Sequence, residues 1–246
     1  MQLFLLPFAG GGFYSFEFLK IELRNSGIDI HSLELPGRGK RLNSDFVSNK
    51  AGAIADYVAQ IKKLRNSKPY IIYGHSMGAT LGLSVTHKME EDNDPPFQII
   101  VTGNAGPCIV EKDDNGNEIV VDRYLLSDVD FKNELRKLNG ISEQVLENKE
   151  LFDFFSPILR SDFEILEKQR HYEKEIKINS PIHAIMGDKE KTSVEIENWK
   201  HYTKNDFTSE VLSGDHFFIY QHVDKLVNII MQYSQPFLQK HNHSDS

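Results

Sequence analysis

The chain is poor in cysteine. Its 246 residues include a single one, Cys108, so no disulfide can form within the chain. Disulfides are typical of oxidising compartments, and their exclusion favours a reducing one. We therefore expect a cytoplasmic protein.

The chain also lacks a long hydrophobic run and a basic N-terminus. Its opening, MQLFLLPFAGGG, is apolar, but Pro7 interrupts the run and the first basic residue is Lys20. A membrane-spanning helix needs about 20 apolar residues, and a secretory signal begins with a basic segment. We interpret the opening run as a buried strand.

The chain has fewer basic than acidic residues, with 28 Lys and Arg and 36 Asp and Glu, which gives a net charge of −8. This balance argues against bulk attraction to nucleic acid or to an anionic membrane, although a local basic patch can still attract an anion. We expect neither nucleic acid nor a membrane as a partner. Hydrophobic residues make up 39% of the chain and charged residues 26%. These values are typical of a soluble globular protein, and the length fits one large α/β domain or two small ones.

Short apolar runs recur along the chain, with helical patterns between most of them. Residues 48–66 place apolar side chains at i, i+3, i+4 and i+7 after a candidate N-cap, Ser48, and residues 222–238 repeat the pattern. Strands that alternate with helices are typical of an open, mostly parallel, doubly wound α/β sheet. The six predicted strands are residues 3–7, 28–35, 70–73, 97–102, 182–186 and 210–212.

This alternation stops between residues 111 and 177. A polar stretch around Asn115 and Gly116 is followed by two or three helical patterns, with Ser127 and Ser142 as candidate N-caps. A helical block between two strands of a parallel sheet covers one edge of that sheet. We therefore predict a helical lid at 111–177, inserted into a core of residues 1–110 and 178–240, and a disordered tail at 241–246.

The segment Gly74-His75-Ser76-Met77-Gly78 follows a predicted strand and precedes a predicted helix. G-x-S-x-G in this context predicts a nucleophile elbow, a tight turn that exposes the serine hydroxyl above the sheet edge. The same turn points the backbone N–H of Met77 at the group that Ser76 attacks. A serine in an ordinary glycine-rich turn is the alternative interpretation.

A serine nucleophile needs a base and an acid, which follow it along the chain in this fold. His216 lies in a glycine-containing loop after the last predicted strand, whereas the other histidines fit strand, helix or surface positions. Asp188 and Glu190 follow the strand that ends at Gly187, and Asp215 adjoins His216. These carboxylates are the candidate acids, and each also fits a solvated loop.

The glycine-rich loop PFAGGG follows the first predicted strand. Glycines let backbone amides approach a ligand closely, and in this fold such a loop supplies the second oxyanion donor. We favour the N–H of Ala9, with Phe8 as the neighbouring alternative. A phosphate-binding loop is the rival interpretation, but no G-x-x-x-x-G-K-[ST] or G-x-G-x-x-G pattern occurs in the sequence.

The motifs LPFAGGG, ELPGRGKR, YGHSMGA and SGDHFF, with the lid stretch LRKLNGISEQVLENKELFDFFSPILRSDFEILE, together resemble one family. It is the type II thioesterases of nonribosomal peptide and polyketide synthesis, within the α/β-hydrolases. The resemblance covers nearly the whole chain. Medium-chain thioesterases of animal fatty acid synthase share the same motifs, so the resemblance does not identify the pathway.

The resemblance implies a serine thioesterase that hydrolyses acyl groups from the phosphopantetheine thiol of carrier proteins and so edits misprimed synthases. It implies Ser76 as nucleophile, His216 as base, and the N–H groups of Met77 and Ala9 as the oxyanion hole. No metal or organic cofactor is needed for this chemistry, and we expect a monomer.

The chain departs from the family pattern at two places. The family's aspartate lies three residues after the glycine that ends its strand, and Glu190 occupies that position here. The resemblance therefore favours Glu190 as the acid, with Asp188 as the alternative. The family also usually has a second glycine where this chain has Asp215.

The loop PGRGKR places Arg38, Lys40 and Arg41 after the second predicted strand, at the sheet edge that carries Ser76. These cations are candidate contacts for the phosphopantetheine phosphate or for an acidic carrier protein. A solvated loop is the equally simple interpretation. Two further functions fit the sequence: a carboxylesterase or acyltransferase with the same triad, and an inactive module that only docks on a synthase.

Overall fold

The computed structural model describes residues 1–113 and 115–238. Its centre is a six-stranded sheet in the order β2-β1-β3-β4-β5-β6, in which every neighbouring pair is parallel. The predicted doubly wound parallel sheet and all six predicted strands are therefore confirmed. The strands are β1 (Gln2–Leu6), β2 (Asp29–Ser32), β3 (Tyr70–His75), β4 (Gln98–Thr102), β5 (Ile182–Gly187) and β6 (Phe207–Leu212).

Helices cover both faces of the sheet. On one face lie α1 (Glu17–Leu23) and α7 (Val223–Leu238), and on the other lie α2 (Lys50–Leu64) and α3 (Met77–Glu91). Because both faces are covered, β1, β3, β4 and β5 are buried along their whole length, which is why they are continuous apolar runs.

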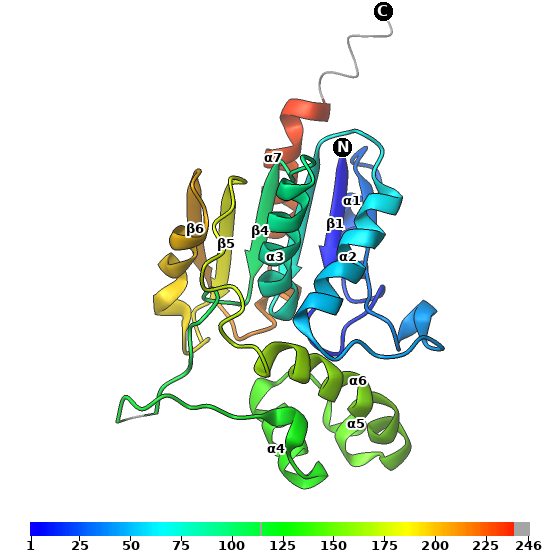
Figure 1. Cartoon of the computed structure of the whole chain (residues 1–246), viewed down its shortest axis with the longest axis vertical. Coiled ribbons are helices and arrows are strands. Elements are labelled where there is room, and N and C mark those ends of the chain that lie inside the picture. The colour runs from blue at the N-terminus through cyan, green and yellow to red at the C-terminus, as the bar shows by residue number, and fades with distance from the viewer. Residues whose placement is uncertain (114, 239–246) are drawn as a thin grey trace, which may run out of the picture.

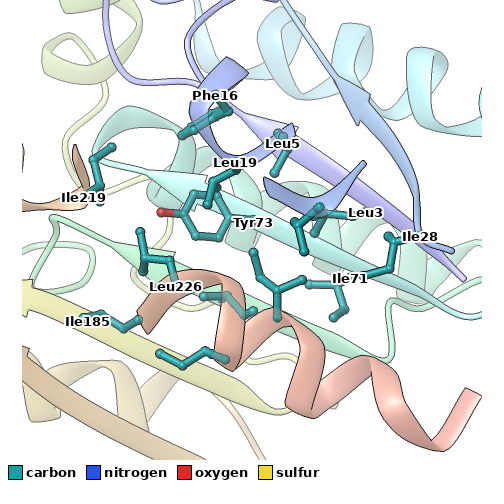
Figure 2. Packing of buried hydrophobic residues seen from close by; sticks show 14 of the residues in the cluster. Leu3, Leu5, Phe16, Leu19, Ile28, Ile71, Tyr73, Ile185, Ile219 and Leu226 are labelled. Carbon is teal, nitrogen blue, oxygen red and sulfur yellow. The ribbon is translucent and has the colours of Figure 1, made fainter. Parts of the chain in front are cut away.

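The core on the α1 and α7 face is built from alternate residues of the central strands. Figure 2 shows Leu3 and Leu5 of β1 together with Ile71 and Tyr73 of β3, with Leu226 of α7 beside them. Alternate residues of a strand point to opposite faces of the sheet. Phe4 of β1 and Ile72 of β3 therefore pack against α2 and α3 on the other face.

One helix begins one residue later than predicted. The N-cap of α2 is Asn49, not Ser48, because the Asn49 side chain accepts a hydrogen bond from the N–H of Gly52. An asparagine at this position satisfies one of the helix's unpaired N–H groups as well as a serine does.

Three helices lie between β4 and β5, in the segment predicted as the lid: α4 (Asp128–Leu138), α5 (Glu143–Glu147) and α6 (Lys149–Glu167). They lie together beyond the end of the sheet to which the strands point, the end that carries Ser76 (Figure 1). Ser127 caps α4 by accepting from the N–H of Asp130, whereas Ser142 precedes α5 without a side-chain capping bond.

Four short 3₁₀ helices complete the described fold: η1 (Gly39–Arg41), η2 (Arg123–Leu125), η3 (Ser193–Tyr202) and η4 (Phe218–Tyr220). The predicted disordered tail, 241–246, lies outside the described residues. Within residues 1–113 and 115–238, no helix combines the length and the apolar character that crossing a bilayer requires.

Candidate active site

Ser76 lies at the turn between β3 and α3. Its backbone has φ 56° and ψ −113°, in the left-handed half of conformational space that residues other than glycine rarely adopt. The N–H of Ser76 donates to the carbonyl of Thr102 on β4 at 2.8 Å, which helps to hold the turn. The strain is typical of a serine held in a functional conformation.

The two glycines that flank Ser76 are required by close backbone contacts. A Cβ at Gly74 would lie 2.1 Å from the carbonyl oxygen of Gly78, and a Cβ at Gly78 would lie 2.0 Å from that of Leu6. Both contacts are with backbone atoms, which cannot move aside as a flexible side chain can. The turn therefore excludes any larger residue at either position.

His216 and Glu190 approach Ser76 from loops after two later strands. His216 Nε2 lies 3.0 Å from Ser76 Oγ, and His216 Nδ1 lies 2.7 Å from Glu190 Oε2. The other carboxylate oxygen of Glu190 accepts from the N–H of Gly187 at 2.8 Å, which fixes the orientation of the carboxylate. The three side chains form one hydrogen-bonded chain from carboxylate to imidazole to hydroxyl.

The other two candidate acids make different contacts. Asp188 Oδ1 accepts from the N–H of Gly214 at 2.8 Å and so ties the loop after β5 to the loop that carries His216. Asp215 accepts from the N–H of Phe217 and from Asn139 Nδ2. In the described part of the chain neither carboxylate bonds to His216, so Glu190 is the one that reaches the imidazole.

Of the residues considered as oxyanion donors, Phe8 and Ala9 line the same cavity as Ser76, and Met77 follows Ser76 directly in the chain. Met77 is the first residue of α3, where a backbone N–H has no partner in the preceding turn. Across residues 1–113 and 115–238, no hydrogen bond uses the N–H of Met77, of Ala9 or of Phe8. All three N–H groups therefore lack a partner within the described residues, and the choice between Ala9 and Phe8 stays open.

A cavity of about 600 Å³ joins these groups to the predicted lid. Ser76, His216 and Glu190 line it from the core, together with Phe8 and Ala9. The lid contributes an apolar wall of Leu135, Leu138, Ile141, Leu159, Phe163 and Leu166, and a charged part with Arg123, Glu134 and Glu167. Burial raises the pKa of Glu167, although hydrogen bonding to Arg123 opposes the shift. The cavity can hold an acyl chain next to the serine.

His75, directly before Ser76, is buried at the end of β3. Its Nδ1 lies 2.9 Å from Thr102 Oγ1, and its ring centroid lies 5.0 Å from that of His216. Burial holds the pKa of His75 well below its usual value, and the neighbouring His216 adds to this effect. A neutral imidazole therefore packs against the imidazole of the candidate triad.

The interpretation of Arg38 as a carrier contact is wrong. Arg38 is 3% exposed, and its guanidinium is bound by both carboxylate oxygens of Asp162 on α6. Arg41 forms a bidentate pair with Asp56 at the surface. Lys40 is exposed, with its ammonium 4.7 Å from the ring centroid of Phe13. Of the three cations, Lys40 is the most accessible to a partner.

No group of three or more His, Cys, Asp or Glu side chains within residues 1–113 and 115–238 is arranged to hold a metal ion. The chemistry that the site offers is that of a hydroxyl nucleophile activated by an imidazole, beside backbone donors for a developing oxyanion. Acyl transfer through a covalent serine intermediate uses this set of groups.

Comparisons with known proteins point to one family. The family model of the thioesterase domain matches residues 1–233. The gramicidin S biosynthesis protein GrsT of Aneurinibacillus migulanus is 32% identical over 228 residues, which are 90% of this chain and 84% of that protein. The medium-chain S-acyl fatty acid synthase thioesterase of Rattus norvegicus is 26% identical over 222 residues, 89% of this chain and 81% of its own. The structure of the type II thioesterase BorB from the borrelidin biosynthetic cluster matches with a TM-score of 0.80 at 28% identity, covering 94% of this chain and 91% of BorB.

Proposed function

The chain belongs to the thioesterase family, as its motifs indicated, and has the α/β-hydrolase fold; we propose that it hydrolyses acyl groups from the phosphopantetheine thiol of carrier proteins. Similar proteins take part in gramicidin S and borrelidin biosynthesis. By this likeness, the enzyme edits a nonribosomal peptide or polyketide synthase and frees carriers that hold an unwanted acyl group. Its partner is an acyl- or peptidyl-carrier protein in the cytoplasm, and it acts as a monomer.

Hydrolysis proceeds through an acyl-enzyme. His216 Nε2 takes the proton of Ser76 as Oγ attacks the thioester carbonyl, and the N–H groups of Met77 and Ala9 donate to the resulting oxyanion. The carbon–sulfur bond then breaks, and the thiol leaves with the proton from His216. Water, deprotonated by His216, attacks the acyl-enzyme, and its collapse releases the carboxylic acid and returns a proton to Ser76.

Glu190 has two tasks in this scheme. Its carboxylate accepts from Nδ1–H and so keeps Nε2 free to take the Ser76 proton. It also stabilises the positive imidazolium that forms in each half of the reaction.

The single observation that carries the proposal is the hydrogen-bonded chain of Ser76, His216 and Glu190 at the wall of the cavity beneath the lid. The strained serine conformation and the unused N–H groups beside it support the same chemistry. An inactive docking module would have no use for these features.

Ser76→Ala tests the nucleophile. Loss of a triad member typically lowers kcat by about 10⁴–10⁶, and we expect a loss of that size with acyl-carrier protein as substrate. Within residues 1–113 and 115–238 the only side-chain hydrogen bond of Ser76 is to His216, so the unfolding midpoint should stay near that of the parent. Activity within tenfold of the parent, in a folded variant, would refute the assignment.

Substrate comparison separates the thioesterase from an esterase or acyltransferase with the same triad. The parent enzyme is given one acyl group on a carrier protein, on pantetheine and on a simple alcohol. We expect the highest kcat/KM with the carrier thioester and free acid as the product. Preference for the ester, or transfer of the acyl group to an added amine or alcohol, would favour the other functions.

A further inference from the structure

The lid helix α6 is bound directly to the loop of the candidate oxyanion hole. Asp162 on α6 accepts from the backbone N–H of Gly10 at 2.7 Å. Arg38 donates to both oxygens of the same carboxylate, at 2.5 and 2.6 Å, and also to the carbonyl of Gly11 at 3.2 Å. Two residues far apart in the sequence thus hold the backbone next to Ala9.

This ion pair is deeply buried. Asp162 is 0% exposed and Arg38 is 3% exposed. Burial by itself would lower the pKa of Arg38, but the Asp162 carboxylate outweighs it and the pKa is raised, so the guanidinium stays charged. A buried pair of this kind gains stability only when its geometry and its further hydrogen bonds are good. Here the further bonds go to Gly10 and Gly11.

A second contact from the same face of α6 fixes the same loop. Gly10 has φ +79°, and a Cβ on it would lie 2.6 Å from the side chain of Leu159. Leu159 is three residues before Asp162, so both side chains lie on one face of the helix. Ala9 packs in the apolar cluster that contains Leu159 and Phe163. The loop therefore rests on α6 through apolar packing and through the carboxylate.

We infer that Arg38 and Asp162 are positioning residues for thioester hydrolysis: they hold the Gly10–Gly11 segment so that the N–H of Ala9 faces the oxyanion that forms at Ser76. Because Asp162 belongs to α6, the oxyanion hole is complete only while the lid helix is seated on the loop. This inference rests on the proposed function, since it assigns a second layer of support to the same site.

The double variant Arg38→Met with Asp162→Leu tests the inference. It removes both charges together, so no buried charge is left unpaired, and replacing a buried pair by apolar residues is often neutral for stability. The Gly10 N–H loses its acceptor, and only the apolar packing against Leu159 still holds the loop on α6. Removing one oxyanion donor typically costs about 10²–10³ in kcat. Because the donor here is displaced and not removed, we expect a loss of about 10–100-fold in kcat with KM changed less than about threefold.

The rate of Ser76 labelling by a fluorophosphonate is a second readout that needs no knowledge of the natural acyl group. The phosphoryl oxygen of the reagent must enter the oxyanion hole, so the labelling rate should fall by a factor similar to that in kcat. A purely structural role of the pair would lower the unfolding midpoint and leave the labelling rate of the folded protein unchanged.

The matched control is Lys50→Met with Glu173→Leu. Lys50 and Glu173 form another buried ion pair, with side chains 2% and 1% exposed, and within residues 1–113 and 115–238 neither side chain hydrogen-bonds to the glycine loop. This variant should keep kcat and the labelling rate within about threefold of the parent. Arg38→Lys is a milder second variant in case the double variant does not fold. It keeps the charge on Asp162 paired but loses the bidentate geometry, and we expect about a 3–10-fold fall in both rates.

Two results would overturn the inference: parent-like kcat and labelling in a folded Arg38 variant, or equal losses in the Lys50 and Glu173 control. Failure of the proposed function is recognised separately. In that case the parent would not hydrolyse acyl-carrier thioesters, or Ser76→Ala would still do so, whatever the result for Arg38 and Asp162.

Discussion

Glu190→Gln is the perturbation that most sharply tests the candidate triad. One carboxylate oxygen of Glu190 accepts from His216 Nδ1 and the other accepts from the N–H of Gly187. In the glutamine variant only one of these atoms is an acceptor. The Gly187 N–H holds the amide oxygen on its side, so the amide NH₂ group turns toward His216. An NH₂ group cannot accept from Nδ1–H, and the imidazole shifts to the tautomer whose Nε2 carries the proton and cannot deprotonate Ser76.

The size of the expected loss follows from these contacts. A hydrogen bond to a charged group contributes about 1.5–3 kcal/mol. At about 1.4 kcal/mol for each factor of ten, loss of this bond to the imidazolium lowers the rate by about 10–150-fold. The unfavourable tautomer adds to this, because an amide in place of a triad carboxylate can lower kcat by about 10⁴. We expect kcat/KM of Glu190→Gln to fall by about 10³–10⁴.

Asp188→Asn is the matched control for this prediction. Asp188 Oδ1 accepts from the N–H of Gly214, and an amide oxygen can accept the same bond. We expect kcat/KM within about threefold of the parent. Both variants are assayed with one acyl-pantetheine and by the fluorophosphonate labelling rate of Ser76. Equal losses in the two variants, or a larger loss in Asp188→Asn, would show that Glu190 does not orient His216.

Three further predictions concern stability, the carrier and the acyl chain. His75 is buried with a lowered pKa, so its imidazole binds a proton more readily in the unfolded chain than in the folded protein. The free energy of unfolding should therefore drop by about 1.4 kcal/mol for this group between pH 7.5 and 5.5. Urea unfolding should detect this, and His75→Asn should lack that part of the drop. Lys40→Glu should raise KM for acyl-carrier protein several-fold at low salt and little at high salt, with kcat/KM for a short acyl-pantetheine unchanged. Leu138→Trp should fill the lid side of the cavity and lower kcat/KM for octanoyl-pantetheine about tenfold more than for acetyl-pantetheine.

The sheet was predictable from the sequence where both of its faces are buried. The central strands are continuous apolar runs because helices cover them on both sides. The edge strand β6 was recognised only in its last three residues. Each residue of Phe207–Leu212 is half-buried or exposed and none is fully buried, so the run is not continuously apolar. At the other edge, β2 (Asp29–Ser32) is shorter than the predicted 28–35. The prediction was too long because the apolar pattern continues through Leu33 and Leu35, which are buried although they lie beyond the end of the strand.

Ser76 and His216, the candidate nucleophile and base, were recognisable because each lies in a short glycine-containing motif that follows a predicted strand. The acid was less clear, since the loop after β5 offers Asp188 and Glu190 two residues apart, and only the spacing of the family pattern favoured Glu190. Which of them reaches His216 depends on how the turn directs each side chain and on the extra methylene of glutamate. In the structure Asp188 bonds to Gly214 and Glu190 bonds to His216. The contact of Glu190 with His216 agrees with the position that the family spacing favoured, but residue type alone does not determine it, because it depends on the tertiary geometry of the loop.

Arg38 was misinterpreted because its loop was considered without the helix that it contacts. The flanking glycines have positive φ, Gly37 at 82° and Gly39 at 49°, and a Cβ on Gly39 would lie 2.1 Å from Glu34 Oε2. These glycines allow the loop to turn so that Arg38 points inward. The sequence did contain the matching signal. Asp162 lies three residues after Leu159, within the apolar face of α6, and a carboxylate buried there needs a partner that carries the opposite charge. A carboxylate inside an apolar helical stripe thus predicts a buried cation as its partner, and Arg38 is that cation here. Considering the two together would have placed Arg38 beneath the lid instead of at the carrier surface.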